Sequence, residues 1–135
     1  DRFVHFDSDL VDNAIELVLK GDYLPLKSFT AFGAFPDCGQ TWNLFLLESY
    51  CRRFSQRFRF DTPSVNSRNA GSVIRRSCVM DYTQVMTDAV ANADIPLTEA
   101  NVGRFLYDSG YIGRSTTKQV SEIIEKAKAI RERRN

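Results

Sequence analysis

Arginines are the residues of this sequence whose type and spacing best suit a chemical task, and they concentrate in one segment. Residues 49–80 hold seven arginines, no lysine and a single acid, Asp61. Arginine presents its N–H donors in a planar fork that matches phosphate oxygens and the edge of guanine, and a cluster of cations releases counterions when it meets nucleic acid. We therefore predict a nucleic-acid-binding patch for DNA or RNA, built from Arg52, Arg53, Arg57, Arg59, Arg68, Arg75 and Arg76.

The same arginines have a second interpretation, because the charge of the chain is unevenly spread. The net charge is only +1, yet residues 1–48 carry eight acids and three bases, whereas residues 81–135 carry equal numbers of each. Such asymmetry points either to a charged partner or to an internal acid–base interface. In the internal case, the arginines pair with the acidic first third of the chain. If the charged partner is a protein, the chain is instead a protein-interaction or assembly module. Its arginines pair with an acidic surface of a protein partner, or of a second copy in a homodimer.

A second candidate contact lies at the start of the last predicted helix. Two helices are predicted over 82–93 and 99–109, with Asp81 and Thr98 as their caps, and Gly110 forms a tight turn before a third helix from about residue 116. This order is similar in outline to a helix-turn-helix unit, in which the last helix reads the nucleic acid. The alternative is an ordinary helical hairpin with a polar cap. In the helix-turn-helix interpretation, phosphate or base contacts come from Arg114, Ser115, Thr116, Thr117 and Lys118.

Metal-binding and catalytic patterns have weak support. His5 is the only histidine, and the three cysteines follow no C-x-x-C spacing. Residues 110–116 read GYIGRST, which lacks the G-x-x-x-x-G-K-[ST] spacing of a phosphate-binding loop. Asp7, Asp9 and Asp12 stand near the start of the first predicted helix, where we interpret them as a solvated acidic end. We therefore expect no catalytic residue, no metal and no cofactor.

Apolar residues at helical spacing predict most of the elements. The helices are predicted over 7–21, 41–60, 82–93 and 99–109, and from about residue 116. Residues 67–77 fit either a short helix capped by Ser67 or a strand. Residues 22–40 are predicted as an ordered segment over the core, with room for one short helix or strand. The prediction is a mainly α fold, a compact bundle of five or six helices. One domain spans residues 1–135, with an acidic part (1–48), a basic part (49–80) and a neutral helical part (81–135).

Aromatic residues are dense before and within the second predicted helix. Phe29, Phe32 and Phe35 stand three apart in a segment too apolar for a solvated loop. We expect these rings in the core. Trp42 and Phe45 fall at the edge of the apolar arc of their helix, so they either join the core or form part of a contact surface.

The compartment is predicted from what the sequence contains. No apolar run approaches the ~18 residues that a membrane span needs, and no signal peptide is visible. An odd number of cysteines argues against a disulfide framework. We therefore expect a cytoplasmic protein without a membrane partner. The chain begins with Asp1 rather than methionine, which we expect of a piece of a longer protein.

Overall fold

The structure, a computed structural model, describes residues 5–30, 32–63, 70–113 and 117–134, with residues 117–119 described by their backbone alone. Helices dominate the regular structure, which confirms the mainly α class. The described residues form α1 (Ser8–Val18), α2 (Leu44–Arg53), α3 (Tyr82–Asn92), α4 (Glu99–Ser109), α5 (Thr117–Arg134) and a short 3-10 turn, η1 (Leu26–Ser28).

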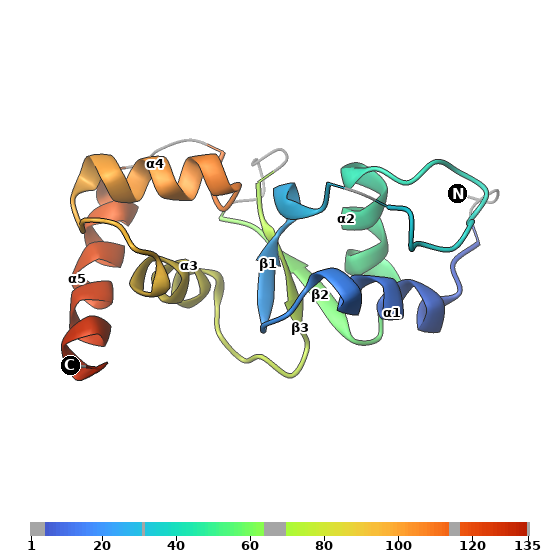
Figure 1. Cartoon of the computed structure of the whole chain (residues 1–135), viewed down its shortest axis with the longest axis horizontal. Coiled ribbons are helices and arrows are strands. Elements are labelled where there is room, and N and C mark those ends of the chain that lie inside the picture. The colour runs from blue at the N-terminus through green and yellow to red at the C-terminus, as the bar shows by residue number, and fades with distance from the viewer. Residues whose placement is uncertain (1–4, 31, 64–69, 114–116, 135) are drawn as a thin grey trace.

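A small antiparallel sheet lies at the centre of the molecule (Figure 1). Its strands are β1 (Tyr23–Pro25), β2 (Phe58–Asp61) and β3 (Ser72–Arg75). β3 is the middle strand, and its Val73 lies opposite Leu24 of β1 and Phe60 of β2. Because side chains alternate between the two faces of a strand, Val73 and the next residue, Ile74, point in opposite directions. They enter two different apolar cores.

The α1–α2 core covers the face of the sheet that carries Val73. It combines the inward side chains of α1 and α2 with the apolar residues of β2 and with aromatic rings from the segment between η1 and α2. The large side chains that are fully buried here include Val11, Ile15, Phe29, Leu47, Tyr50 and Phe58. This core therefore depends on segments far apart in the sequence.

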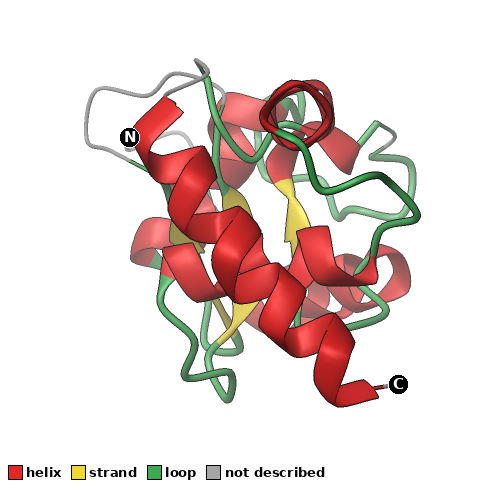
Figure 2. Ribbon diagram, turned by 90° about the vertical axis from the view of Figure 1, so that its left-hand side faces the viewer, coloured by secondary structure: helices red, strands yellow, loops and turns green. Residues whose placement is uncertain are grey.

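The α3–α5 core covers the opposite face, which carries Ile74. α5 packs along both α3 and α4, and Figure 2 shows it crossing the near end of the molecule. The buried stripe of α5 (Val120, Ile123, Ile124, Ala127) faces Val85, Met86 and Leu106 within the same core. The five helices thus form two groups on either side of a sheet, whereas the sequence predicted one bundle.

The helices of the α3–α5 core begin and end where the sequence predicted. Asp81 caps α3 by accepting a hydrogen bond from the amide of Gln84, whose side chain accepts from the Asp81 amide in return. Thr98 caps α4, which ends at Gly110 in the left-handed conformation (φ 92°). These signals act between residues a few positions apart, so the local sequence is enough to fix them.

The predicted helix over 41–60 is wrong in its second half, since α2 ends at Arg53 and β2 follows. The Asp12 carboxylate on α1 accepts the backbone N–H groups of Gln56 and Arg57, at 3.2 Å each. In a longer helix these amides would bond to carbonyls four residues earlier. A tertiary partner therefore ends the helix. The residues of β2 alternate between apolar and polar, as in a strand. The same apolar residues also fit the helical spacing of the segment before them, so the strand was not predicted.

The segment over 67–77 adopts the strand rather than the helix, to the extent that it is described. Gly71 precedes β3 with φ +142°, and an added Cβ there would lie 2.5 Å from a ring atom of Phe60. A side chain would clash at this position, so glycine permits the close contact between the chain segments. The expected Ser67 cap lies outside the described residues.

No helix among the described residues is long and apolar enough to cross a membrane.

Candidate functional site

The structure shows where most of the arginines of the predicted patch lie and how exposed each one is. Six of its seven arginines are described, and Arg68 lies outside the described residues. They differ in exposure and in the groups to which they bond. Arg57, Arg59 and Arg75 are only partly exposed, and each is bonded within the chain, whereas Arg52, Arg53 and Arg76 are exposed.

Asp12 is the buried centre around which this region is built. Its carboxylate is 1% exposed and lies in α1 beside the apolar side chains Val11 and Ile15. One oxygen accepts hydrogen bonds from the Tyr50 hydroxyl at 2.8 Å and from the Ser55 hydroxyl at 2.6 Å. The other accepts the two amides that end α2. A buried charge is tolerated when its oxygens are this fully hydrogen-bonded. The expectation of a solvated acid is therefore wrong for Asp12.

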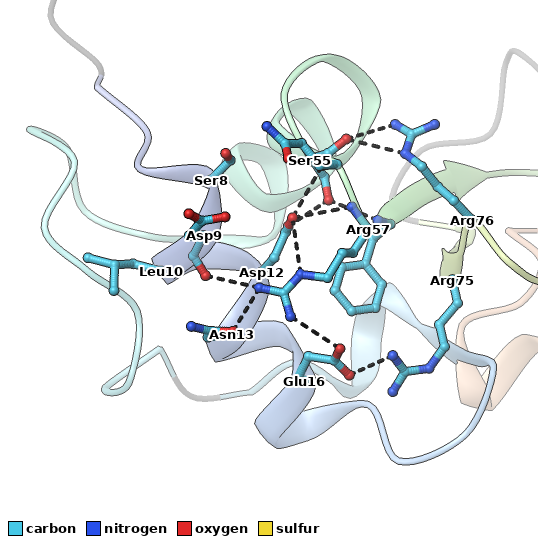
Figure 3. Close-up of polar contacts among 12 residues, drawn as sticks. Ser8, Asp9, Leu10, Asp12, Asn13, Glu16, Ser55, Arg57, Arg75 and Arg76 are labelled. Carbon is cyan, nitrogen blue, oxygen red and sulfur yellow. Dashed lines mark hydrogen bonds and ion pairs between the residues drawn. The ribbon is translucent and has the colours of Figure 1, made fainter.

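Arg57 and Arg75 both clamp α1 to the sheet (Figure 3). Their guanidinium groups reach the same carboxylate, that of Glu16, at 3.4 Å and 2.5 Å. Arg57 also donates to the side chain of Asn13 at 2.7 Å. Arg75 donates to the carbonyls of Leu19 and Gly21 beyond the end of α1, where the helix dipole is negative. These arginines pair with the acidic first third of the chain, as the alternative interpretation of the charge pattern expects.

Arg59 and Arg76 bond mainly to backbone carbonyls. Arg59 donates to the carbonyl of Met80 at 2.8 Å and to that of Cys78 at 3.3 Å, which fixes the loop between β3 and α3. Arg76 donates twice to the carbonyl of Ser55, at 3.2 and 3.0 Å. Both side chains therefore hold loops in place. Arg76 differs from Arg59 in that it remains exposed.

Arg52 and Arg53 occupy the last turn of α2 and face solvent. Arg52 pairs with Glu48 one turn earlier at 3.0 Å, and its guanidinium lies 4.9 Å from the ring centroid of Phe60. Arg76 lies nearby through its bonds to Ser55, which follows α2 by two residues. Among the described arginines of the central segment, Arg52, Arg53 and Arg76 are therefore the most exposed, and the side chain of Arg57 is still 40% exposed.

The second predicted contact set falls at the edge of what the structure describes. Arg114, Ser115 and Thr116 lie outside the described residues, and Thr117 and Lys118 belong to α5 without described side chains. The next turns of α5 expose Ser121, Glu122 and Glu125. Two carboxylates on this surface would repel phosphate. Lys126, one turn after Glu122, pairs with it at 2.9 Å and offsets part of this negative charge.

The aromatic residues divide between core and surface. Phe29 and Phe35 are buried, as predicted, and Phe32 and Trp42 are half-buried along an open groove formed by residues 32–42. Phe45 lies in the first turn of α2 with 78% of its surface exposed. It does not join the core, because the inward face of α2 is occupied by Leu47, Tyr50 and Cys51 instead.

Burial shifts the pKa values of two side chains near Asp12, Tyr50 and Cys51. It raises the pKa of the Tyr50 hydroxyl, and the hydrogen bond that this hydroxyl donates to Asp12 raises the pKa further. Burial likewise raises the pKa of the Cys51 thiol, with the charge of Asp12 adding to the shift. Both groups stay protonated at neutral pH. Cys51 therefore lacks the thiolate form that a nucleophilic cysteine requires.

Asp12 and Ser55 are the residues that sequence reasoning missed. A signal for Asp12 was present, because its position falls within the buried stripe formed by Val11, Ala14 and Ile15. A charged residue on a buried helix face requires a partner. No comparable local signal marks Ser55, whose role depends on α1. Comparison of the chain with protein-family models, with curated proteins and with solved structures found no match.

Proposed function

We propose that this chain is a non-enzymatic protein-interaction or assembly module, and that the outer face of α2 is its contact surface. The observation that carries the proposal is the exposed ring of Phe45. Exposed Arg52 and Arg53 and half-exposed Ser49 complete this face. Burying a phenylalanine contributes about 1.5–3 kcal/mol, and aromatic and arginine side chains are enriched at protein interfaces.

The chemistry of the face indicates the kind of partner. Phe45 supplies an apolar anchor, and the other end of α2 carries exposed guanidinium groups. A complementary surface has an apolar recess next to carboxylates. The bonds of Arg57, Arg59 and Arg75 within the chain favour this proposal over a broad phosphate-binding patch, because recruiting them for phosphate would sacrifice contacts that hold α1 and the loop before α3.

Photo-crosslinking tests the proposal. The photoreactive residue p-benzoyl-phenylalanine replaces Phe45 in cells that make the full-length protein, and Tyr107, which is exposed on α4, provides the matched control position. We expect a discrete adduct from position 45 that resists nuclease and is digested by protease. The adduct should disappear when Arg52→Glu and Arg53→Glu are added. Equal labelling from both positions would overturn the proposed surface, and the adduct mass separates a second copy from another protein.

Nucleic-acid binding is the second candidate, supported by one observation. Arg52, Arg53 and Arg76 keep exposed guanidinium groups near the C-terminal end of α2. The proposed helix-turn-helix-like unit would add the first turn of α5, after α3, α4 and the Gly110 turn. In this candidate the protein acts in the cytoplasm on DNA or RNA and needs no cofactor.

An anisotropy titration separates the two candidates. Labelled duplex DNA, single-stranded DNA and RNA are titrated at about 50 and about 200 mM salt, a range over which binding through several phosphates weakens strongly. Nucleic-acid binding predicts salt-sensitive affinity that is lost in Arg53→Glu/Arg76→Glu and kept in the control Arg104→Glu on α4. The absence of binding at the lower salt concentration would eliminate this candidate and leave the protein interface.

A further inference from the structure

The segment between η1 and α2 forms an open groove of about 640 Å³ that the proposed function does not use. Its walls include the rings of Phe32, Phe35 and Trp42, together with Pro36 and Asp37. Phe45, on the outer face of α2, is not among the residues that line it. The groove is open to solvent along its length, which suits an extended peptide better than a small molecule that needs enclosure.

The aromatic rings are held in fixed positions. Phe32 and Trp42 are stacked, with centroids 6.3 Å apart and planes 17° apart. Phe35 packs against both, at 5.2 and 4.9 Å. The indole N–H of Trp42 donates to the carbonyl of Pro36 at 2.8 Å. The ring of Phe6 packs against the indole, with centroids 5.6 Å apart. The groove therefore offers π surfaces whose orientation is set before any ligand binds.

The polar groups of the groove favour a cation. The indole N–H is already used, and the amide of Gly39 donates to Oδ1 of Asp37 at 3.0 Å. The second oxygen of Asp37, Oδ2, accepts no hydrogen bond from the described residues. Gln40 and Thr41 add neutral polar groups to the lining, and its charged group is the exposed carboxylate of Asp37. This carboxylate and the aromatic rings both attract positive charge.

The surroundings of the groove strengthen this preference. The amide of His5 donates to the carbonyl of Cys38 at 2.9 Å, so the chain just before α1 lies beside the segment that carries Asp37. Asp7 and Asp9, which follow His5, are also exposed. Within the described part of the chain, no lysine or arginine forms an ion pair with these three carboxylates. The charge of Asp37 is therefore not paired with a cation among the described residues.

We propose that the groove binds an extended protein segment through an arginine side chain. The guanidinium group stacks on the rings of Phe32 and Trp42, and Asp37 balances its charge. Arginine suits the site better than lysine, because its planar group stacks on an aromatic face while its N–H groups reach a carboxylate. Apolar side chains next to that arginine contact Phe35 and Pro36. This inference is independent of the proposed function, since it uses neither Phe45 nor the arginines of α2.

The only tryptophan of the chain, Trp42, lies in the groove and reports on binding. The probes are an acetylated, amidated peptide Gly-Leu-Arg-Leu-Gly and the same peptide with citrulline, the neutral isostere of arginine. Fluorescence and the single indole N–H resonance are followed in the full chain. We expect saturable changes with the arginine peptide and roughly tenfold weaker binding of the citrulline peptide, the ratio that about 1.4 kcal/mol of cation–π and ionic attraction produces.

Matched variants separate charge from ring contacts. Asp37→Asn and Phe32→Leu should each weaken the arginine peptide several-fold and leave the citrulline peptide unchanged. Asp22→Asn removes an exposed acid between α1 and β1 and should change neither affinity. Circular dichroism checks that every variant is folded. Equal affinities for the two peptides would overturn the proposal. A response to tetramethylammonium chloride without a response to the arginine peptide would overturn the peptide assignment.

Discussion

The two cores on either side of the sheet are held by different forces. In the α1–α2 core a buried carboxylate, Asp12, gathers four hydrogen bonds, and two arginines clamp α1 through Glu16. In the α3–α5 core most buried side chains are apolar, and three helices pack along apolar stripes. Its buried polar groups include Thr87 and the hydroxyl of Tyr82, which donates to the carbonyl of Tyr111 at 2.7 Å. Apolar packing is non-directional, whereas hydrogen bonds fix orientation. Polar bonds therefore specify where α1 sits, whereas α3, α4 and α5 pack mainly through buried apolar area, with Arg131 of α5 bonding the carbonyls at the end of α3.

Asp12→Ala should have the largest effect on stability, because it removes the polar centre that distinguishes the α1–α2 core from the α3–α5 core. The substitution removes the acceptor shared by the Tyr50 and Ser55 hydroxyls and two backbone amides, although Tyr50 keeps the carbonyl of Ser8 at 3.1 Å. We expect the free energy of unfolding to fall by about 3–5 kcal/mol, as when one member of a buried charge network is removed. Urea denaturation measures the loss. Asp94→Ala, at an exposed acid after α3, is the control, and a loss as small as that of the control would contradict the central role of Asp12.

Leu106→Ala probes the α3–α5 core in the same assay. Leu106 is fully buried in α4, and its truncation should cost about 3 kcal/mol through lost apolar contacts and a residual cavity. The neighbouring Tyr107 is exposed, so Tyr107→Ala serves as control. The loss at Leu106 should hardly change between low and high salt. A strong salt dependence would show that charge also determines the stability of this core.

Arg75→Met and Arg131→Met compare the two cores directly. Arg75 combines an ion pair to Glu16 with two carbonyl contacts, whereas Arg131 caps the end of α3 through carbonyls alone, the closest at 2.6 Å. Each substitution should cost about 1.5–3 kcal/mol. Raising the salt from about 0.1 to about 1 M should shrink the effect at Arg75 more than at Arg131, because screening acts on the ion pair. Equal salt responses would remove this distinction.

Asp81→Ala should have the smallest effect of these substitutions. It removes one half of the capping box at the start of α3, and we expect a loss of about 1 kcal/mol. Hydrogen exchange should increase in the first turn of α3 and stay unchanged in α1. A double-mutant cycle with Gln84→Ala should show that the two effects are not additive. Additive losses would indicate that the reciprocal bonds do not act as a unit.

The sequence predicted the α3–α5 core better than the α1–α2 core, and the reason lies in contact distance along the chain. The caps at Asp81 and Thr98 and the stop at Gly110 were correct, because each involves residues within one helical turn. The end of α2 was wrong, because it depends on Asp12, which is more than forty residues away. The exposure of Phe45 could not be predicted either, because a residue at the edge of the apolar arc of a helix can lie in the core or at the surface.

The sequence by itself determined the helical class, the caps of α3 and α4 and the uneven distribution of charge. Helical spacing, capping and composition are properties of neighbouring residues, and they persist in any fold that the chain adopts. Only the tertiary structure decided which arginines remain available. An arginine side chain can bond to phosphate, to a carboxylate or to a backbone carbonyl with the same donors. The partner that folding brings within reach settles the choice, and for Arg57 and Arg75 that partner is α1.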